Sequence, residues 1–308
     1  MKFSFVLPAY KGRYLRDSIE SILRQDYQDF ELIVVDDCSP DSLQEIVSSF
    51  QDSRVSYYRN EQNIGGKNLV AQWNHCLSYA KGEYVILATD DDLYEKNFLS
   101  SFVPLIEKYP FADLFRARVL VVDSENKIKE IDRCFKEHLT EAEFRYHMMH
   151  AIRGGIPQYI FRREALNAKG GFIDFPLAWG SDDATAMMMS QHGVINSQEH
   201  LVRFRYSDIN ISSDQKRTAI PKLKARLQLA QWMEDHKLVV SQTGDWTLFY
   251  KREVIDFLPT HIKQLLIVRL TAIPWNQWPA ALHLIMESDV LPKADKLSVL
   301  YYAMKKKL

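Results

Sequence analysis

Three consecutive aspartates, Asp90 to Asp92, follow the apolar run of residues 84–88. Neighbouring carboxylates repel one another, and a buried unpaired carboxylate is costly unless water or a cation compensates its charge. Mg²⁺ and Mn²⁺ prefer oxygen ligands and often bind through one or two carboxylates together with substrate phosphates. The triplet is therefore either a solvated turn or part of a metal site. A turn that caps the helix near Glu95 explains one aspartate better than three.

A second acidic group, Asp36 and Asp37, ends the apolar run of residues 32–35. The segment that follows has the composition of a helix start, with Asp41 or Ser42 as the N-cap. This interpretation leaves Asp36 and Asp37 without a local structural role. A carboxylate at a strand end can accept a hydrogen bond from a nucleobase N–H or a ribose hydroxyl, so the pair is a candidate nucleotide site.

Predicted strands and helices alternate over residues 1–100 and must position these carboxylates. Aromatic and β-branched runs predict strands, and apolar residues on one face of a 3.6-residue period predict helices. The predicted strands are residues 3–7, 32–35, 55–58 and 84–87, with helical patterns over 15–23, 43–50 and 70–77. This alternation predicts an α/β fold with a mostly parallel, doubly wound sheet that is covered on both faces.

The carboxyl ends of these strands carry the residues that are suited to chemistry. They read Pro8-Ala9-Tyr10, Asp36-Asp37, Arg59-Asn60 and Asp90-Asp91-Asp92. In open α/β sheets, ligands bind in the crevice beyond the carboxyl ends of the strands. An aromatic residue, an acidic pair and an acidic triplet at one edge therefore predict a ligand crevice there.

The rest of the chain is expected to be largely helical. A further strand is predicted at residues 114–122, and helices are predicted at 140–152 and 221–236. The chain ends in amphipathic segments without obvious chemistry. A soft boundary near residues 214–221 divides the chain into a catalytic domain, residues 1–213, and a helical C-terminal extension, residues 214–308.

The composition excludes several classes of protein. The chain has 308 residues, of which 46% are hydrophobic, so it is long and apolar enough to fold around a core. Its formal net charge of -1 predicts no general attraction to nucleic acid. The three cysteines fit neither a disulfide framework nor a zinc site. With no signal peptide or spanning segment in view, we expect a cytoplasmic protein.

The C-terminal lysines, Lys305 to Lys307, leave two readings open. They are expected to form a solvated helix end, or a peripheral contact with the inner face of a membrane. The C-terminal helices are likewise candidates for core packing, for a membrane contact or for a homodimer interface.

Three stretches of the sequence resemble the successive signatures of family 2 inverting glycosyltransferases, which have the A-type nucleotide-diphosphosugar transferase fold. They are "SFVLPAYKGRYLRDSIESILRQDYQDFELIVVDDCSPDS", "NIGGKNLVAQWNHCLSYAKGEYVILATDDD" and "GSDDATAMMM". The resemblance is continuous over residues 3–110 and looser over 154–213. It implies a Rossmann-like sheet of the glycosyltransferase A type, followed by the helical extension.

The resemblance also implies a nucleotide site at the strand ends. Residues that match the nucleoside and diphosphate pocket are Pro8, Ala9, Tyr10, Asp37, Asn63, Gly65 and Lys67. Tyr10 would lie near the base, and Lys67 near the diphosphate. Asp37 would bond the uracil edge, so that a UDP-sugar is the expected donor.

Within the acidic triplet, Asp91 matches the metal-binding aspartate of the family's DxD motif, and Asp92 is the second expected ligand of Mn²⁺ or Mg²⁺. Asp90 would face the ribose or the donor sugar. Thr89 stands where many members have the first aspartate of the motif, which leaves the division of roles among the three aspartates open. Ser207 stands where a histidine often completes the metal site, with Arg203, Arg205 and Tyr206 as further residues able to reach the diphosphate.

The family's catalytic base matches the pair Asp182 and Asp183. In an inverting transfer, this carboxylate removes the proton from the acceptor hydroxyl. Asp183 occupies the second position of the pair and is the expected base, with Asp182 as the alternative. A helix N-cap is the competing interpretation, because an apolar helical run follows at residues 184–189.

The resemblance thus implies transfer of a hexose or N-acetylhexosamine from a UDP-sugar to a saccharide or lipid-linked saccharide, in bacterial cell-surface polysaccharide biosynthesis. Two alternatives stay open. A sugar nucleotidyltransferase would have a glycine-rich basic loop, which only residues 11–13 approach. A non-catalytic nucleotide-sugar-binding protein would not need the Asp182-Asp183 pair. A dinucleotide-dependent dehydrogenase is disfavoured, because no GxGxxG motif follows the first strand.

Overall fold

The first strand, β1 (Phe3–Ala9), contributes side chains to two hydrophobic clusters. Phe5 belongs to one cluster and Val6 to another. Successive side chains of a strand point to opposite faces, so a strand that is covered on both faces is apolar at nearly every position. The computed structural model describes residues 3–152, 155–207, 210–211, 213–214, 216–238 and 245–307, with the backbone alone at 245–247.

In the described part of the chain, the strands form one ten-stranded sheet in the order β3-β2-β1-β4-β9-β6-β10-β5, with β7 paired to β6 and β8 to β10. The further strands are β2 (Phe30–Asp36), β3 (Val55–Arg59), β4 (Tyr84–Leu87), β5 (Leu93–Tyr94), β6 (Leu114–Val122), β7 (Ile128–Ile131), β8 (His138–Leu139), β9 (Tyr159–Arg162) and β10 (Val194–Arg205). All five strands that were predicted are present.

The sheet is mixed: of the strand pairings among the described residues, four are parallel and five are antiparallel. β2 and β4 are parallel to β1, β3 is parallel to β2, and β10 is parallel to β6. β9 is antiparallel to both of its neighbours, β4 and β6. The expected α/β fold is therefore confirmed, with a parallel block of β3, β2, β1 and β4 and a mixed arrangement beyond β4. The carboxyl ends of β1, β2 and β4 lie at one edge.

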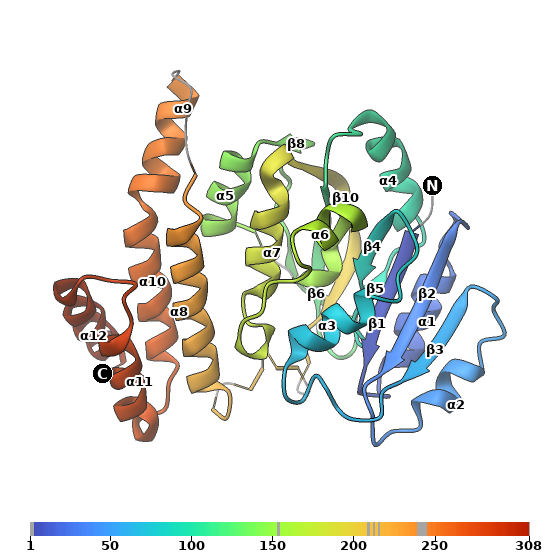
Figure 1. Ribbon diagram of the computed structural model, residues 1–308, viewed down its shortest axis with the longest axis horizontal. Coiled ribbons are helices and arrows are strands. Elements are labelled where there is room, and N and C mark those ends of the chain that lie inside the picture. The colour runs from blue at the N-terminus through green and yellow to red at the C-terminus, as the bar shows by residue number, and fades with distance from the viewer. Residues whose placement is uncertain are drawn as a thin grey trace.

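Helices cover both faces of the sheet (Figure 1). They are α1 (Leu15–Leu23), α2 (Leu43–Ser48), α3 (Leu69–Leu77), α4 (Phe98–Lys108), α5 (Glu141–His150), α6 (Arg163–Ala168), α7 (Ser181–Met189), α8 (Ala219–Asp235), α9 (Asp245–Tyr250), α10 (Leu258–Thr271), α11 (Trp278–Glu287) and α12 (Lys293–Lys307). Short 3-10 or π turns lie at Ile156–Gln158, Pro176–Ala178, Ser190–His192, Lys251–Asp256 and Trp275–Gln277. α1, α2 and α4 share the cluster of Phe5, whereas α3, α7, α8 and α10 share that of Val6.

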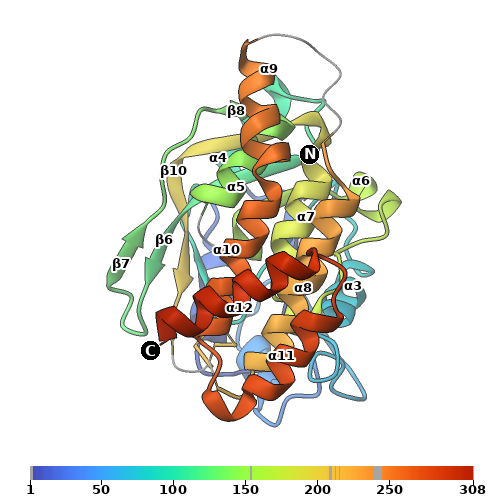
Figure 2. The ribbon, with the colours of Figure 1, turned by 90° about the vertical axis from the view of Figure 1, so that its left-hand side faces the viewer.

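The C-terminal helices pack on the Val6 side of the sheet. α12 packs across α10 and against α11, and both α10 and α11 pack on α8 (Figure 2). Leu223 of α8, Leu266 of α10 and Val299 of α12 belong to the same buried cluster as Val6. The expected extension thus shares a hydrophobic core with the sheet, and its boundary near residue 214 stays a prediction.

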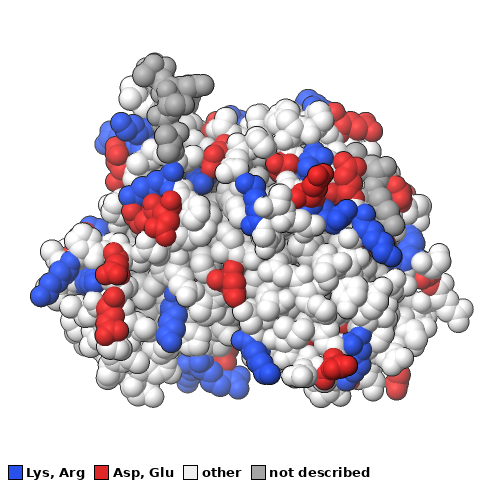
Figure 3. All heavy atoms as spheres, in the orientation of Figure 1, with Lys and Arg blue, Asp and Glu red and all other residues white. Residues whose placement is uncertain are grey.

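Two surface properties bear on partners. Acidic and basic side chains are interspersed over the face in Figure 3, in keeping with the formal net charge of -1. Within the described residues, no helix is both long enough and apolar enough to cross a membrane.

Candidate active site

Asp36, at the end of β2, has a structural role that the sequence interpretation missed. Its side chain is fully buried and accepts hydrogen bonds from the Tyr57 hydroxyl at 2.6 Å and the Ser39 N–H at 2.8 Å, and it forms an ion pair with Arg59. These contacts tie the end of β2 to β3. The expectation that Asp36 lacks a structural partner was therefore wrong, because its partners lie on a neighbouring strand.

Asp37 organises the loop between β3 and α3. One carboxylate oxygen accepts from the Asn60 side chain and the Ile64 N–H, both at 2.8 Å. The other accepts from the Gly65 N–H at 2.6 Å. The Asp37 N–H donates to Ala9 at 2.9 Å, so this loop is fixed against the end of β1. Asp37 is 4% exposed and lies where the sequence placed a nucleotide contact.

Gly65→Ala is expected to destabilise this loop. A Cβ atom at Gly65 would lie 2.8 Å from Oδ2 of Asp37, closer than real Cβ atoms approach an oxygen. The hydrogen bond to the carboxylate must lengthen or break, and a bond to a charged group contributes about 1.5–3 kcal/mol. We expect the free energy of unfolding in urea to fall by an amount of that order. Glu61→Ala, at an exposed position of the same loop, is the control; equal losses in both variants would contradict this role.

Tyr10 and Asp90 lie at neighbouring strand ends. Oδ2 of Asp90 accepts from the backbone N–H groups of Tyr10 at 3.0 Å and Lys11 at 2.8 Å. The Tyr10 side chain is 40% exposed, as a ring available for stacking must be, and Pro8 is half-buried beside it. Asp90 therefore fixes the backbone that presents the tyrosine, in addition to any contact with a ligand.

The remaining residues of the expected nucleotide pocket lie in the loop that Asp37 holds. Asn63 is half-buried and accepts from the Gly66 N–H at 2.5 Å, whereas Lys67 is exposed. The structure thus brings Tyr10, Asp37 and this loop together at the predicted edge.

Asp91 is a buried carboxylate of the acidic turn. Burial raises its pKa to about 6, with a further contribution from the charge of Asp90, while nearby Lys11 and Arg205 offset only part of the penalty. Its Oδ2 accepts from the Asn210 side chain at 3.0 Å. Burial likewise raises the pKa of Asp90.

A hard divalent cation fits this donor set. Two adjacent carboxylates with raised pKa values gain most from a positive charge beside them. Among the described residues no group of three or more His, Cys, Asp or Glu forms a cage, but Mg²⁺ and Mn²⁺ sites of this kind draw their other ligands from water and substrate phosphates. Asp90 and Asp91 are therefore the residues that would hold the cation.

Asp92 points into the protein. It is 1% exposed, and its carboxylate accepts from the Thr89 hydroxyl at 2.5 Å and from the Arg205 N–H at 2.7 Å. Burial raises its pKa strongly. With both oxygens engaged by protein donors, Asp92 connects the acidic turn to β10, a role that the sequence interpretation did not anticipate. None of the three aspartates caps α4, which begins after Asn97.

Arg205 and Asn210 hold the acidic turn through hydrogen bonds to Asp91. The Arg205 Nε donates to the Asp91 carbonyl at 2.9 Å, and its guanidinium lies 4.2 Å from the centre of the Tyr14 ring. Arg205 is 3% exposed, so it is not free to reach a ligand. Asn210 also accepts from the Ser207 hydroxyl at 2.5 Å. Ser207, which stands where the family often has a histidine, is thereby linked to Asp91 through Asn210.

The second carboxylate pair begins α7. Gly180, with a φ of 89°, precedes the helix, and the Asp182 and Asp183 side chains lie in the first turn without capping it. Asp183 is 37% exposed and lies 3.5 Å from the guanidinium of Arg226 on α8. Burial raises the pKa of Asp182 to about 7, and the charge of Asp183 adds to the effect. The N-cap interpretation is therefore wrong, and Asp183, but not Asp182, lines a pocket.

Asp182→Asn should alter how stability depends on pH. The carboxyl has a pKa near 3.9 when unfolded and about 7 when folded, so the folded state holds the extra proton between these values. The wild type therefore loses stability as pH rises from 4 to 7, by up to about 1.4 kcal/mol per unit. In urea titrations at several pH values, the free energy of unfolding of the variant relative to that of the wild type should increase up to pH 7. Asp289→Asn, at an exposed position, is the control, and its stability should depend on pH as that of the wild type does. The same pH dependence in Asp182→Asn as in the wild type would contradict the raised pKa of Asp182.

Lys222 connects the two carboxylate sites. Its buried ammonium donates to the carbonyl of Ile211, beside Asn210, at 2.7 Å and lies 4.3 Å from the centre of the Trp179 ring. Arg226, one helical turn further along α8, reaches Asp183. The acidic turn and the α7 pair are thus joined through α8.

Asn210, Lys222 and Arg226 were missed by sequence reasoning. Asn210 lies close to Ser207, and the sequence drew attention to that segment only for Ser207. Lys222 and Arg226 lie on α8, a helix that was predicted from its apolar residues alone. Asp208, beside Ser207, lies outside the described residues.

Comparisons with known proteins agree with this arrangement. The family model described as Glycosyl transferase family 2 matches residues 4–169. The glycosyltransferase GlyG of Streptococcus pneumoniae is 38% identical over 108 residues, which are 34% of this chain and 35% of GlyG. Matches to three curated relatives cover only 35 to 44% of their lengths.

Two solved structures resemble the whole chain. TarS 1–349 of S. aureus in complex with UDP-GlcNAc superposes with a TM-score of 0.73 at 19% identity, over 100% of this chain and 88% of that one. A mannosyltransferase of Pyrobaculum calidifontis, PcManGT, in complex with GDP-Man and Mn²⁺ gives a TM-score of 0.57 at 17% identity, over 99% of this chain and 86% of that one. At these identities the likeness establishes the fold.

Proposed function

This chain belongs to glycosyl transferase family 2, and we propose that it is an inverting transferase that moves a hexose or N-acetylhexosamine from a UDP-sugar to a saccharide or lipid-linked saccharide acceptor. The observation that carries the proposal is the pairing of two carboxylate sites. Asp90 and Asp91 lie with Tyr10 at the strand ends, and Asp183 faces a separate pocket that is joined to them through α8.

The donor is proposed to bind at the edge that carries Tyr10 and Asp37. The uracil would stack near the exposed tyrosine ring, and the Asp37 oxygen that accepts only from Gly65 would also accept the uracil N–H. Asn63, Gly65 and Lys67 of the adjoining loop would line the ribose and diphosphate. The UDP-GlcNAc in the TarS structure supports UDP as the nucleotide.

The diphosphate is proposed to reach the acidic turn. A divalent cation held there by Asp91, with Asp90, would neutralise charge that develops on the departing diphosphate. The Mn²⁺ in the PcManGT structure supports this cofactor class. Asp92, whose carboxylate is engaged by Thr89 and Arg205, would keep the turn in place rather than ligate the ion.

Asp183 is proposed to act as the general base. An acceptor hydroxyl in the adjoining pocket would give its proton to the carboxylate while its oxygen bonds to the anomeric carbon of the donor sugar. The bond from that carbon to the diphosphate oxygen breaks on the opposite face, and its electron pair leaves with UDP. The products are the β-linked glycoside from an α-linked donor, UDP, and a protonated carboxyl that returns its proton to water.

The setting is proposed from the relatives and from the surface. TarS is a poly(ribitol-phosphate) β-N-acetylglucosaminyltransferase, which supports a role in bacterial surface polysaccharide assembly. On α12, Leu297, Tyr301 and Met304 are 56%, 57% and 40% exposed beside the C-terminal lysines. This surface supports the expected peripheral contact with the inner face of a membrane, and a homodimer interface is the alternative use of it.

A donor screen tests the proposed function. The protein, with Mn²⁺ and a mixed panel of simple glycosides, is offered UDP-, GDP-, and CMP-sugars, and nucleotide release and product configuration are followed by NMR. We expect release of UDP from a UDP-sugar and a product of inverted configuration. Formation of a sugar 1-phosphate would favour a nucleotidyltransferase, and UDP binding without turnover would favour a non-catalytic binding protein.

A further inference from the structure

A pocket of about 240 Å³ opens beside Asp183, between α5, α7, α8 and α10. Four of the nine methionines of the chain line it: Met148, Met149, Met187 and Met233. Leu229 and Leu265 add to the apolar wall, while His150, Asp183, Arg226 and His261 supply polar atoms. The pocket therefore combines flexible apolar side chains with a substantial polar surface, which suits a ligand that carries both C–H groups and hydroxyls.

We propose that this pocket is the acceptor subsite and that it receives a single uncharged pyranose ring. The inference rests on the proposed function, and it adds the substrate class. A pyranose presents C–H faces to the methionines and leucines and hydroxyl groups to the polar side chains. One of those hydroxyls would meet Asp183.

The size of the pocket limits the acceptor to one ring within it. Sites for drug-sized ligands measure about 300–1,000 Å³, and this pocket is smaller. A longer saccharide or a lipid-linked carrier would extend from the pocket into solvent.

The charges around the pocket favour a neutral ring. The carboxylate of Asp183 is matched by Arg226 at 3.5 Å. Burial lowers the pKa of His261 to about 4, so its imidazole is uncharged at neutral pH. The charges of Asp183 and Arg226 already balance each other. A uronate or phosphate in the pocket would add a negative charge without a partner, and burying an unpaired charge is costly.

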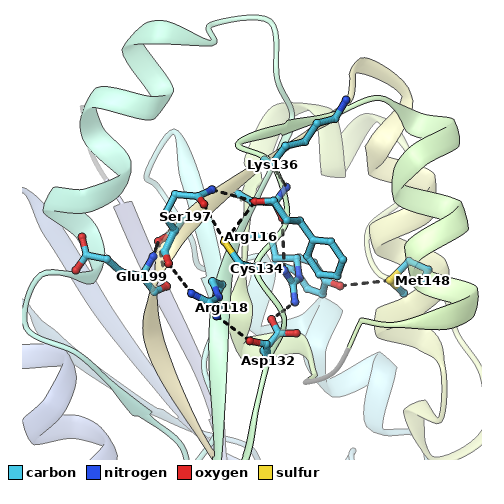
Figure 4. A network of polar contacts seen from close by, with 12 residues as sticks. Arg116, Arg118, Asp132, Cys134, Lys136, Met148, Ser197 and Glu199 are labelled. Carbon is cyan, nitrogen blue, oxygen red and sulfur yellow. Dashed lines mark hydrogen bonds and ion pairs between the residues drawn. The ribbon is translucent and has the colours of Figure 1, made fainter. Parts of the chain in front are cut away.

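The wall opposite α8 is fixed by a polar network (Figure 4). The hydroxyl of Tyr159 on β9 contacts the sulfur of Met148 at 3.8 Å. On the neighbouring strand, Arg116 forms a fully buried ion pair with Asp132 and lies 3.5 Å from Asn196. Met148 of α5 is thus held against the sheet, whereas Met233, Arg226, Leu229 and Leu265 come from the C-terminal helices, beyond the residues that the family model matches.

Arg226 is the positioning residue of this subsite. It contacts Asp183 through one guanidinium nitrogen and lies 5.6 Å from the centre of the Trp179 ring. A Cβ atom at Gly180 would lie 3.4 Å from the same nitrogen and 3.0 Å from Leu229, so a glycine is needed where α7 meets α8. Choice of acceptor therefore depends on the C-terminal helices.

Methionine methyl NMR tests the subsite without requiring turnover. The full chain, labelled with ¹³C at the methionine methyls, is titrated with the methyl β-glycosides of glucose, galactose and N-acetylglucosamine, and with methyl β-glucuronide. We expect a neutral glycoside to shift the signals of the four pocket methionines. The affinity for the glucuronide should be at least about tenfold lower. Met286 and Met304, exposed on α11 and α12, should not respond.

Two variants make the assignment specific. Leu265→Trp, at a half-buried position of the wall, should weaken the glycoside shifts by at least about tenfold, whereas Val268→Trp, 64% exposed on the same helix, should leave them within about twofold. The proposal is overturned if no neutral glycoside moves these methyls, if the glucuronide binds better, or if Leu265→Trp binds as the wild type does. A parallel UDP titration separates the two claims. If UDP binds but the methyls stay still, only the subsite fails, and the reverse result removes the donor assignment instead.

Discussion

Asp183→Asn is expected to lower the rate of sugar transfer by about 10²–10⁴-fold while UDP affinity stays within about twofold of the wild type. The amide cannot accept the proton of the acceptor hydroxyl, and it keeps the size of the carboxylate. Its oxygen still faces Arg226, which lies 3.5 Å away in the wild type, so the start of α7 should be preserved. Initial rates with the UDP-sugar found by the donor screen give the size of the effect, and calorimetry gives the UDP affinity.

Asp182→Asn is the matched control for this experiment. The two residues are adjacent in the first turn of α7, but only Asp183 lines the pocket. We expect Asp182→Asn to retain turnover within about tenfold, because its part is to set the charge beside the base. A large loss in Asp182→Asn with normal rates in Asp183→Asn would exchange the two roles. Normal rates in both variants would remove the pair from the mechanism.

Asp91→Asn is expected to remove the dependence of activity on Mn²⁺ and to lower the rate at saturating Mn²⁺ by at least about 100-fold. Loss of one carboxylate removes half of the negative charge that Asp90 and Asp91 offer. An asparagine oxygen can still accept from Asn210, now 3.0 Å from the carboxylate, so the local fold should survive. Rates measured over a range of Mn²⁺ concentrations test the prediction.

Asp92→Asn serves as the control at the same turn. Its carboxylate is engaged by Thr89 and by the Arg205 N–H, so the variant should lose stability and keep the Mn²⁺ dependence of the wild type. The opposite pattern, with Mn²⁺ dependence lost in Asp92→Asn and kept in Asp91→Asn, would show that Asp92 rather than Asp91 binds the cation.

The sheet was predictable because its rules are local. β1 is apolar on both faces, and the helical spacing of residues 15–23 and 70–77 is strong, so the parallel strands and their carboxyl edge followed from the sequence. Very short strands such as β5, with two residues, carry too little pattern to be recognised. They form because longer strands provide an edge to pair with.

The partners of the acidic residues were not predictable from the sequence. Asp36 and Asp92 look as available as Asp37 and Asp91 in the sequence, but their oxygens accept from donors on other strands, β3 and β10. Direction of a side chain at a strand end depends on the turn that follows, and a single sequence does not fix that turn. Arg226 contacts Asp183 across 43 positions of the chain, a contact that only the packing of α8 against α7 creates.

We propose that the strand ends hold uridine diphosphate through a cation at the acidic turn. Calorimetric titration of the wild type with UDP, with and without Mn²⁺, and with GDP plus Mn²⁺, tests it most directly. We expect UDP binding that Mn²⁺ strengthens by at least about tenfold, about 1.4 kcal/mol or more, with weaker binding of GDP. UDP affinity that is indifferent to Mn²⁺, or equal affinity for GDP, would contradict it.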